Sequence, residues 1–139
     1  MFTATFTQTS TAPASAIYSL WEAVPEWPSW DESLVAATLD GPFEAGTTGT
    51  LQPNGAPEGF PYTLTSVMDG QGFADETLFG PMTLRFIHEV ADTAGGSLIT
   101  LVVEVEGPDA EGVGAEVTGD SQDSLIALAR AAEARTQQA

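Results

Sequence analysis

His88 is the only histidine in the sequence, which contains no cysteine. An imidazole can take up or release a proton near neutral pH, so His88 is the first candidate for general acid–base chemistry. Residues 81–90 alternate between apolar and polar side chains, and this pattern predicts a strand with His88 on the same face as Phe86. The alternative interpretation is a structural histidine that is bonded to a carboxylate or to the backbone.

Three further side chains carry groups that could hold a ligand. The Trp30 ring could stack on an aromatic ligand, or it could close one end of the core. The Tyr62 hydroxyl, on a strand face shared with Phe60 and Leu64, could bond a ligand carbonyl or reach solvent at the sheet edge. The Asp75 carboxylate could approach the same interior, but we expect it to lie at the mouth, in contact with solvent.

The residue inventory argues against several other kinds of site. One histidine and no cysteine leave too few ligands for a zinc centre, so no metal is expected. No G-x-S-x-G elbow, P-loop or dinucleotide-binding glycine motif is present, so no cofactor is expected. The acidic pairs Asp31–Glu32 and Asp75–Glu76 would point apart in a strand, which does not suit a two-carboxylate glycosidase.

The charge balance is strongly acidic, with 20 Asp and Glu residues against three cationic side chains, for a net charge of −17. Such a field repels phosphate backbones and anionic lipid surfaces, which argues against nucleic-acid and membrane-surface partners. The charge fits either solubility or adaptation to high salt. No stretch approaches the length of a membrane span and the N-terminus lacks a signal-peptide pattern, so we expect a cytoplasmic protein.

The strand that carries the histidine belongs to a predicted β-hairpin over residues 81–106, with its turn at residues 91–96. In the expected register, the apolar side chains of the two strands lie side by side on one face, and opposite charges lie near each other on the other face. The expected neighbours are Phe86 beside Leu101, Leu84 beside Val103, and Arg85 near Glu104.

The other predicted elements lead up to a final long helix. Strands are expected at residues 2–9, 33–39, 47–52, 60–68 and 73–79, a helix at 14–23 capped by Ser10 or Thr11, a short helical turn at 25–30, and a helix at 120–135. Met68 should share the strand face of Phe60. Residues 108–119 are rich in glycine and acid and should be weakly helical at best. No linker divides the chain, so we expect one domain over residues 1–139.

A family resemblance rests on several short motifs. They are Trp27, Pro28, Ser29, Trp30 and Asp31; then Asp40, Gly41, Pro42, Phe43 and Gly46; then the strand from Leu84 to Glu89; and the helix with Ala129 to Glu133. The chain resembles the polyketide cyclase/dehydrase-type branch of the START-like superfamily, also called Bet v 1-like or SRPBCC. The resemblance implies an α+β helix-grip fold. A curved antiparallel sheet would wrap around a long C-terminal helix, with two short helices after the first strand and an apolar cavity inside. The glycines of residues 111–119 favour a broken start to that helix.

Three functions remain open on this evidence. The first is binding of a small hydrophobic ligand, aromatic or polyketide-like, lined by Trp30, Phe60, Tyr62, Leu64, Asp75, Leu84, Phe86, His88, Leu101 and Leu125. The second is a cyclase or dehydratase in which His88 moves a proton. The third is a protein-interaction module of the Hsp90-activator-like type, against which the polar outer faces of the predicted strands argue. A monomer and a homodimer both fit the sequence.

Overall fold

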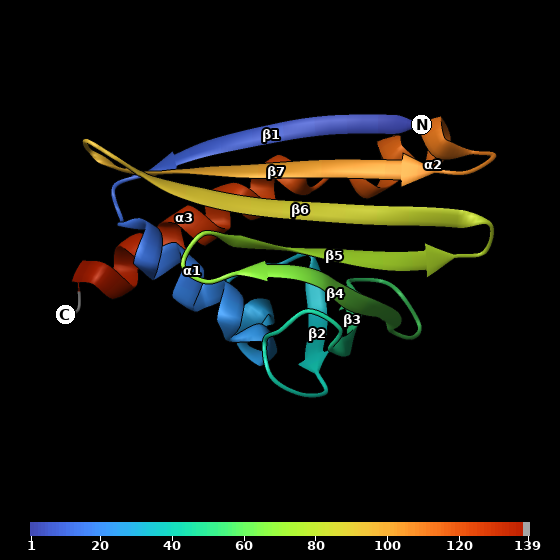
Figure 1. The fold of residues 1–139 in the computed structure, drawn as a ribbon, viewed down its shortest axis with the longest axis horizontal. Helices are drawn as coiled ribbons and strands as arrows, with labels where there is room; N and C mark the ends of the chain where they lie inside the picture. The colour runs from blue at the N-terminus through green and yellow to red at the C-terminus, as the bar shows by residue number, and fades with distance from the viewer. Residues whose placement is uncertain (138–139) are drawn as a thin grey trace.

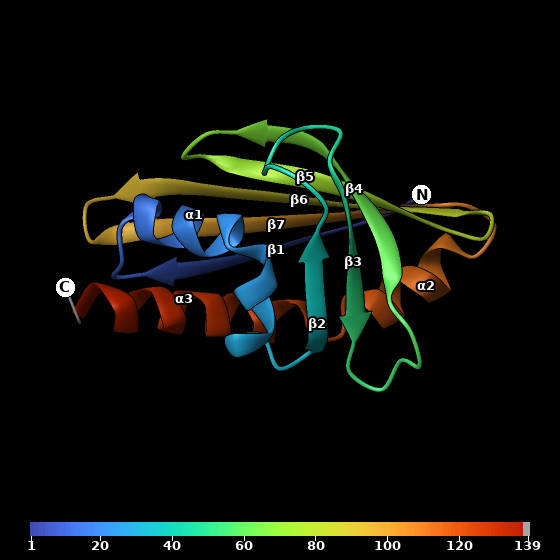
Figure 2. The ribbon, with the colours of Figure 1, turned by 90° about the horizontal axis from the view of Figure 1, so that it is seen from below.

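The fold is taken from a computed structural model, which describes residues 1–137. These residues form one seven-stranded antiparallel sheet with strand order β1-β7-β6-β5-β4-β3-β2, and the helices lie on its concave side (Figures 1 and 2). The elements are β1 (Phe2–Ser10), α1 (Ala14–Glu22), the 3-10 helix η1 (Val24–Ser29), β2 (Leu34–Leu39), β3 (Thr48–Pro53), β4 (Phe60–Met68), β5 (Gly72–Phe79), β6 (Met82–Thr93), β7 (Gly96–Glu106), α2 (Ala110–Val117) and α3 (Ser121–Gln137). The expected helix-grip architecture is confirmed. The last two residues of the predicted domain lie outside the described part.

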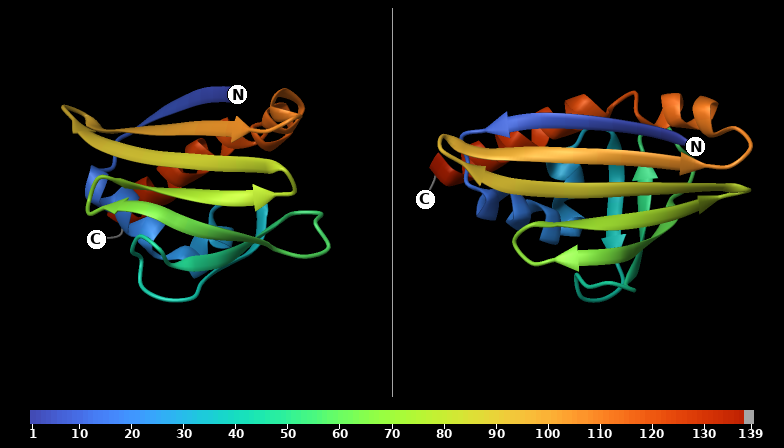
Figure 3. Two further views of the ribbon diagram at one scale, coloured as in Figure 1. Left: turned by 45° about the vertical axis from the view of Figure 1, so that its right-hand side comes forward. Right: turned by 45° about the horizontal axis from the view of Figure 1, so that its top comes forward.

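The curvature of the sheet creates the space that α3 fills. In Figure 2, β2 and β3 run across the direction of β6 and β7, and α3 passes beneath the long strands. Figure 3 shows β1 at one free edge of the sheet, with α3 running behind β1 and β7. The inward face of α3 is apolar, with Leu125, Leu128, Ala129 and Ala132 all buried. This apolar stripe at helical spacing is what holds the helix against the sheet.

The β6–β7 hairpin has a register two residues away from the predicted one. Its turn is only Ala94 and Gly95, so that β6 runs on to Thr93 and the paired strands are longer than expected. The observed pairs are Leu84 with Val105, Phe86 with Val103 and His88 with Leu101. Arg85 lies opposite Glu104, close to it as expected, but its guanidinium group forms ion pairs with Glu76 and Glu106 instead. The short turn sets this register. A shift of two residues keeps every side chain on its expected face, so the division into inner and outer faces is unaffected.

A bulge in β4 corrects the prediction for Met68. The pairing of β4 with β5 shifts between Leu64 and Ser66, which inserts one extra residue into β4. Beyond a bulge the inward and outward positions exchange. Val67 therefore packs against the core, and Met68 is 49% exposed.

The start of α1 is capped by a residue from the far hairpin rather than by its own neighbours. Neither Ser10 nor Thr11 caps the helix, contrary to prediction; the Asp92 carboxylate accepts a hydrogen bond of 2.9 Å from the Ala14 backbone N–H. The Ser10 hydroxyl instead donates to Glu133 of α3 at 2.8 Å, and the Thr11 N–H donates to the same oxygen. These bonds attach the C-terminal half of α3 to the end of β1.

The segment before α3 is helical, which corrects the prediction for residues 108–119. The α2 helix lies against β1, and a Cβ on Gly114 would collide with the Phe2 ring. The glycine that weakens the helix in isolation is therefore what permits its close packing here. The break between α2 and α3 at residues 118–120 agrees with the expected interruption. Within residues 1–137 there is no helix with both the length and the apolar character needed to cross a membrane.

Candidate functional site

The imidazole of His88 is packed into an aromatic cluster. It stacks on Phe73 of the neighbouring strand, with ring centres 4.1 Å apart and planes 6° from parallel, and meets Trp21 of α1 edge-on at 5.7 Å. Its Nδ1 atom is shielded from solvent and has no hydrogen-bond partner within residues 1–137, although the residue as a whole is only partly buried. Desolvation lowers the pKa of His88 to about 4, against a smaller opposing effect of the Phe73 backbone. At neutral pH the ring is therefore uncharged.

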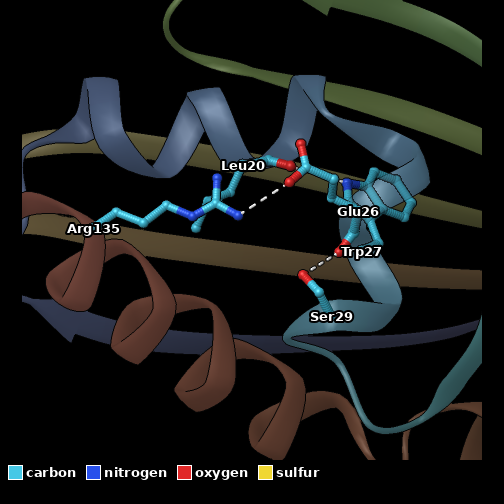
Figure 4. Close-up of polar contacts among 5 residues, drawn as sticks. All are labelled: Leu20, Glu26, Trp27, Ser29 and Arg135. Atoms are coloured by element: carbon cyan, nitrogen blue, oxygen red, sulfur yellow. Dashed lines mark hydrogen bonds and ion pairs between the residues drawn. The ribbon is translucent and has the colours of Figure 1, made fainter.

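The 3-10 helix η1 closes the end of the core that holds Phe73 and His88 (Figure 4). The Trp27 indole N–H donates to the backbone carbonyls of Leu20 and Trp21, both at 3.1 Å, and so satisfies acceptors at the end of α1. An exposed ion pair between Arg135 and Glu26, 3.4 Å apart, joins η1 to α3. The buried indole of Trp27 and the imidazole of His88 both contact Phe73, so this end of the interior is filled by protein side chains.

Asp75 is a buried acid on the concave face of the sheet. It is 5% exposed, so the expectation that it would lie in solvent at a mouth is wrong. Its neighbours across the sheet are Leu64 on β4 and Phe86 on β6. Desolvation alone raises the pKa of Asp75 to about 8, since no hydrogen bond or cation within the described residues offsets the burial. The carboxyl group is therefore mainly protonated at neutral pH.

Tyr62 lies near Asp75, but its hydroxyl proton is already in use. The hydroxyl donates a 2.8 Å hydrogen bond to the Thr38 carbonyl of β2, and the residue is buried rather than at the sheet edge. Burial, followed by the charges of Asp75 and Asp40, raises its pKa above the usual value. Gly49 leaves the space for this ring, because a Cβ there would come within 2.6 Å of the Tyr62 oxygen.

The remaining predicted site residues fall into two groups. Leu64, Leu84, Leu101 and Leu125 are buried in the core between the sheet and α3. Phe60, Phe86 and Trp30 keep partial exposure. The structure thus brings Leu64, Asp75 and Phe86 side by side on three adjacent strands. Phe60 instead contacts Phe79 at the opposite end of β5 from Phe73.

Two hollows of about 430 Å³ each open on the surface, and most of the residues that line them are polar. The first is lined by Thr9, Ser10, Thr11, Thr93, Gly95, Ser97 and Glu133. The second is lined by Trp30, Asp31, Glu32, Ser33, Pro53, Asn54, Asp120, Asp123, Ser124 and Ala127. Of the predicted site residues, only Trp30 lines either hollow. Over residues 1–137, no group of three or more His, Asp or Glu side chains is arranged to hold a metal ion.

Phe73 is the site neighbour that sequence reasoning missed. The signal was present in the Gly80–Pro81 turn, because a two-residue turn after Phe79 pairs Phe79 with Met82 and, counting back, Phe73 with His88. The same count places Asp75 opposite Phe86. The stacking of the two rings depends on this register together with the cover supplied by Trp21 of α1.

Comparison with known protein families finds one that matches this chain. A family model described as "polyketide cyclase / dehydrase and lipid transport" matches residues 1–133. No curated protein matches the chain closely enough to identify a relative.

Solved structures with the same fold have little sequence in common with the chain. The di-domain aromatase/cyclase StfQ of the steffimycin biosynthetic pathway aligns with a TM-score of 0.80 at 8% identity, over 97% of this chain and 51% of its own. Ara h 8.0201 aligns with a TM-score of 0.76 at 14% identity, over 96% and 98% of the two chains. A Thalictrum flavum norcoclaurine synthase point mutant, in complex with a transition-state analogue, aligns at 0.76 and 12% identity, over 97% and 96%. At these identities the likeness concerns the fold.

Proposed function

The chain belongs to the polyketide cyclase / dehydrase and lipid transport family, and we propose that it binds a small hydrophobic molecule between the concave face of the sheet and α3. The ligand would lie over β5 and β6, on the side of Asp75 and Phe86 that faces away from the packed aromatic cluster of Trp21, Trp27, Phe73 and His88.

The partial exposure of Phe86 carries this proposal. Phe86 lies within β6 on the inner face, and its cross-strand neighbours Val103 and Asp75 are 0% and 5% exposed. Phenylalanine is among the residue types most often fully buried, so a partly exposed Phe86 between two buried neighbours leaves apolar surface in contact with water. Its remaining accessibility is what an apolar ligand would remove, and each Å² of apolar surface taken from water contributes about 25 cal/mol.

The test uses the neutral fluorescent probe N-phenyl-1-naphthylamine and two variants. Phe86→Ala removes the proposed contact, and Leu78→Ala removes an apolar side chain that is 69% exposed on the same sheet. We expect wild type and Leu78→Ala to bind alike, and Phe86→Ala to bind about tenfold more weakly. Equal affinity in all three proteins, or no uptake by wild type, would refute the proposal. Circular dichroism of each variant checks that the fold is retained.

An enzymatic cyclase or dehydratase role remains the second candidate, and the geometry bears on its proton carrier. The His88 ring is stacked on Phe73 and its Nδ1 atom is enclosed, which favours packing over proton transfer. Asp75 has a pKa of about 8 and would be the better-placed acid near neutral pH. The third hypothesis, a protein-interaction module, gains no support from the outer surface, where the exposed apolar residues Val35, Met68, Leu78 and Leu98 are spread over four strands.

A further inference from the structure

We propose that Asp75 selects the head group of the ligand: its buried carboxyl group, flanked by Leu64 and Phe86, hydrogen-bonds an uncharged oxygen-bearing group, such as a ketone, enol or phenol, and the interior rejects anions. This inference rests on the proposed hydrophobic binding function and specifies the class of molecule that is bound.

The carboxyl group of Asp75 lies in an apolar part of the inner face. The side chain lies on the middle strand of the sheet, is 5% exposed and is flanked by the apolar residues Leu64 and Phe86. No donor or acceptor within residues 1–137 is hydrogen-bonded to it. The Asp75 oxygens are not among the fully enclosed polar atoms that lack a partner, so they keep a small accessible surface through which a ligand group can reach them. A bound molecule would supply a hydrogen-bond partner there.

The groups that face Asp75 from the neighbouring elements do not stabilise its charged form. On the inner face, β4 contributes Tyr62, whose proton is committed to Thr38, and β6 contributes His88, which is uncharged at neutral pH. The buried residues that α1 and α3 present to the core are almost all apolar. Asp40 lies close enough to Tyr62 to raise its pKa and adds only negative charge. Asp75 therefore stays protonated, with one O–H donor and one acceptor oxygen free for a ligand.

The cationic side chains of the protein all lie outside the interior. The sequence has only three cationic side chains and no lysine. Arg85 forms ion pairs with Glu76 and Glu106, Arg130 is exposed, and Arg135 pairs with Glu26 at the surface. A ligand carboxylate or phosphate would have to leave water for a site with no compensating charge, in a protein of net charge −17. Neutral oxygen groups avoid this cost and still pair with the acid.

The experiment uses probes that share one ring system and differ in head group. They are naphthalene, 2-acetylnaphthalene as the neutral ketone, 2-naphthoate as the anion and 2-naphthylmethylammonium as the cation. We expect wild-type protein, at about pH 6.5, to bind the ketone about tenfold more tightly than naphthalene, and the naphthoate most weakly. The ketone's advantage should disappear as the pH rises well above about 8, because Asp75 then loses its donor proton.

Variants of Asp75 test whether its carboxyl group causes the preference for the ketone. Asp75→Asn keeps a donor and an acceptor, so it should retain the ketone preference and lose its pH dependence. Asp75→Leu should bind naphthalene and the ketone equally. Glu76→Gln, which removes one negative charge from the adjacent position on the outer face, should behave as wild type.

Each other outcome overturns the inference in a recognisable way. If naphthalene binds but the ketone has no advantage in wild type over Asp75→Leu, the binding function stands and the role of Asp75 is wrong. If the ammonium probe binds best, with affinity that rises with pH and is lost in Asp75→Asn, Asp75 acts as a carboxylate that pairs with cations. If no probe binds wild type, the proposed function fails and this inference fails with it.

Discussion

Burial shifts the pKa values of Asp75 and His88, two titratable side chains of the inner face, in opposite directions. Desolvation lowers the pKa of His88 to about 4 and raises that of Asp75 to about 8, so both are mainly neutral near pH 7. The stability contributed by neutral Asp75 is fully present below its unfolded pKa of about 4 and is lost as the pH rises toward 8. The stability contributed by neutral His88 is present above about 6.5 and is lost as the pH falls toward 4.

His88 gives a prediction at the scale of one residue. Relative to His88→Phe, which keeps a ring against Phe73, the wild-type free energy of unfolding should fall by about 3 kcal/mol as the pH is lowered from about 6.5 to about 4. Denaturant unfolding at each pH measures this difference, and an NMR titration of the imidazole protons gives the pKa directly. A midpoint near the unperturbed value of 6.5 would show that the ring is solvated and that the stacked packing is wrong.

The α2 helix shows how packing can outweigh local propensity at the scale of an element. Glycine is a poor helix former, yet Gly114 allows α2 to approach the Phe2 ring of β1. We expect Gly114→Ala to destabilise the protein by about 1–3 kcal/mol, although alanine favours an isolated helix by about 1 kcal/mol. Thermal and denaturant unfolding measure the change.

Two matched variants identify the cause. A Cβ at Gly119 would make only an ordinary contact, 3.5 Å from the Glu116 carbonyl, so Gly119→Ala should be close to neutral. Phe2→Ala should remove most of the penalty of Gly114→Ala, because the ring that the new methyl group meets is gone. A Gly114→Ala protein more stable than wild type would mean that α2 does not pack on β1 in solution.

The net charge of −17 affects the stability of the whole molecule. Four carboxylates, those of Asp31, Glu32, Asp120 and Asp123, line a single surface hollow. Repulsion within such a surface opposes the compact state and is screened when the Debye length falls from about 10 Å at 0.1 M salt to about 3 Å at 1 M. We expect the midpoint of thermal unfolding, Tm, to rise by about 5 °C or more over this range of NaCl.

The control for screening is a single charge change. Glu32→Gln removes one carboxylate of the hollow and should raise the Tm slightly at low salt and lessen its rise with NaCl. A Tm that stays flat or falls with added salt would contradict both the self-repulsion and the interpretation of the charge as adaptation to high salt.

Local sequence patterns predicted most of the strands and helices and the faces they bury, whereas the predictions for α2 and for the face of Met68 beyond the β4 bulge were wrong. The period-two alternation in residues 60–68 predicted β4 with its observed bounds, and the apolar stripe from Leu125 to Ala132 predicted the face of α3 that is buried. Side-chain direction in a strand depends only on neighbouring residues, which is why the two-residue error in the β6–β7 register left the inner and outer faces unchanged. The short motifs around Trp27 to Asp31 and Asp40 to Gly46 indicated the family, which the match over residues 1–133 shows.

What covers each inward-facing residue depends on the tertiary fold and could not be predicted from local patterns. Alternation placed Asp75 on a face, but its burial depends on contacts from distant parts of the chain, and so does the shift of its pKa. The same holds for His88, which is enclosed by Phe73 and Trp21, and for Gly114, whose helix is accommodated by Phe2. Local periodicity encodes direction along the backbone, whereas desolvation and steric fit are set by groups far away in sequence, and these were fixed only when α1 and α3 closed over the sheet.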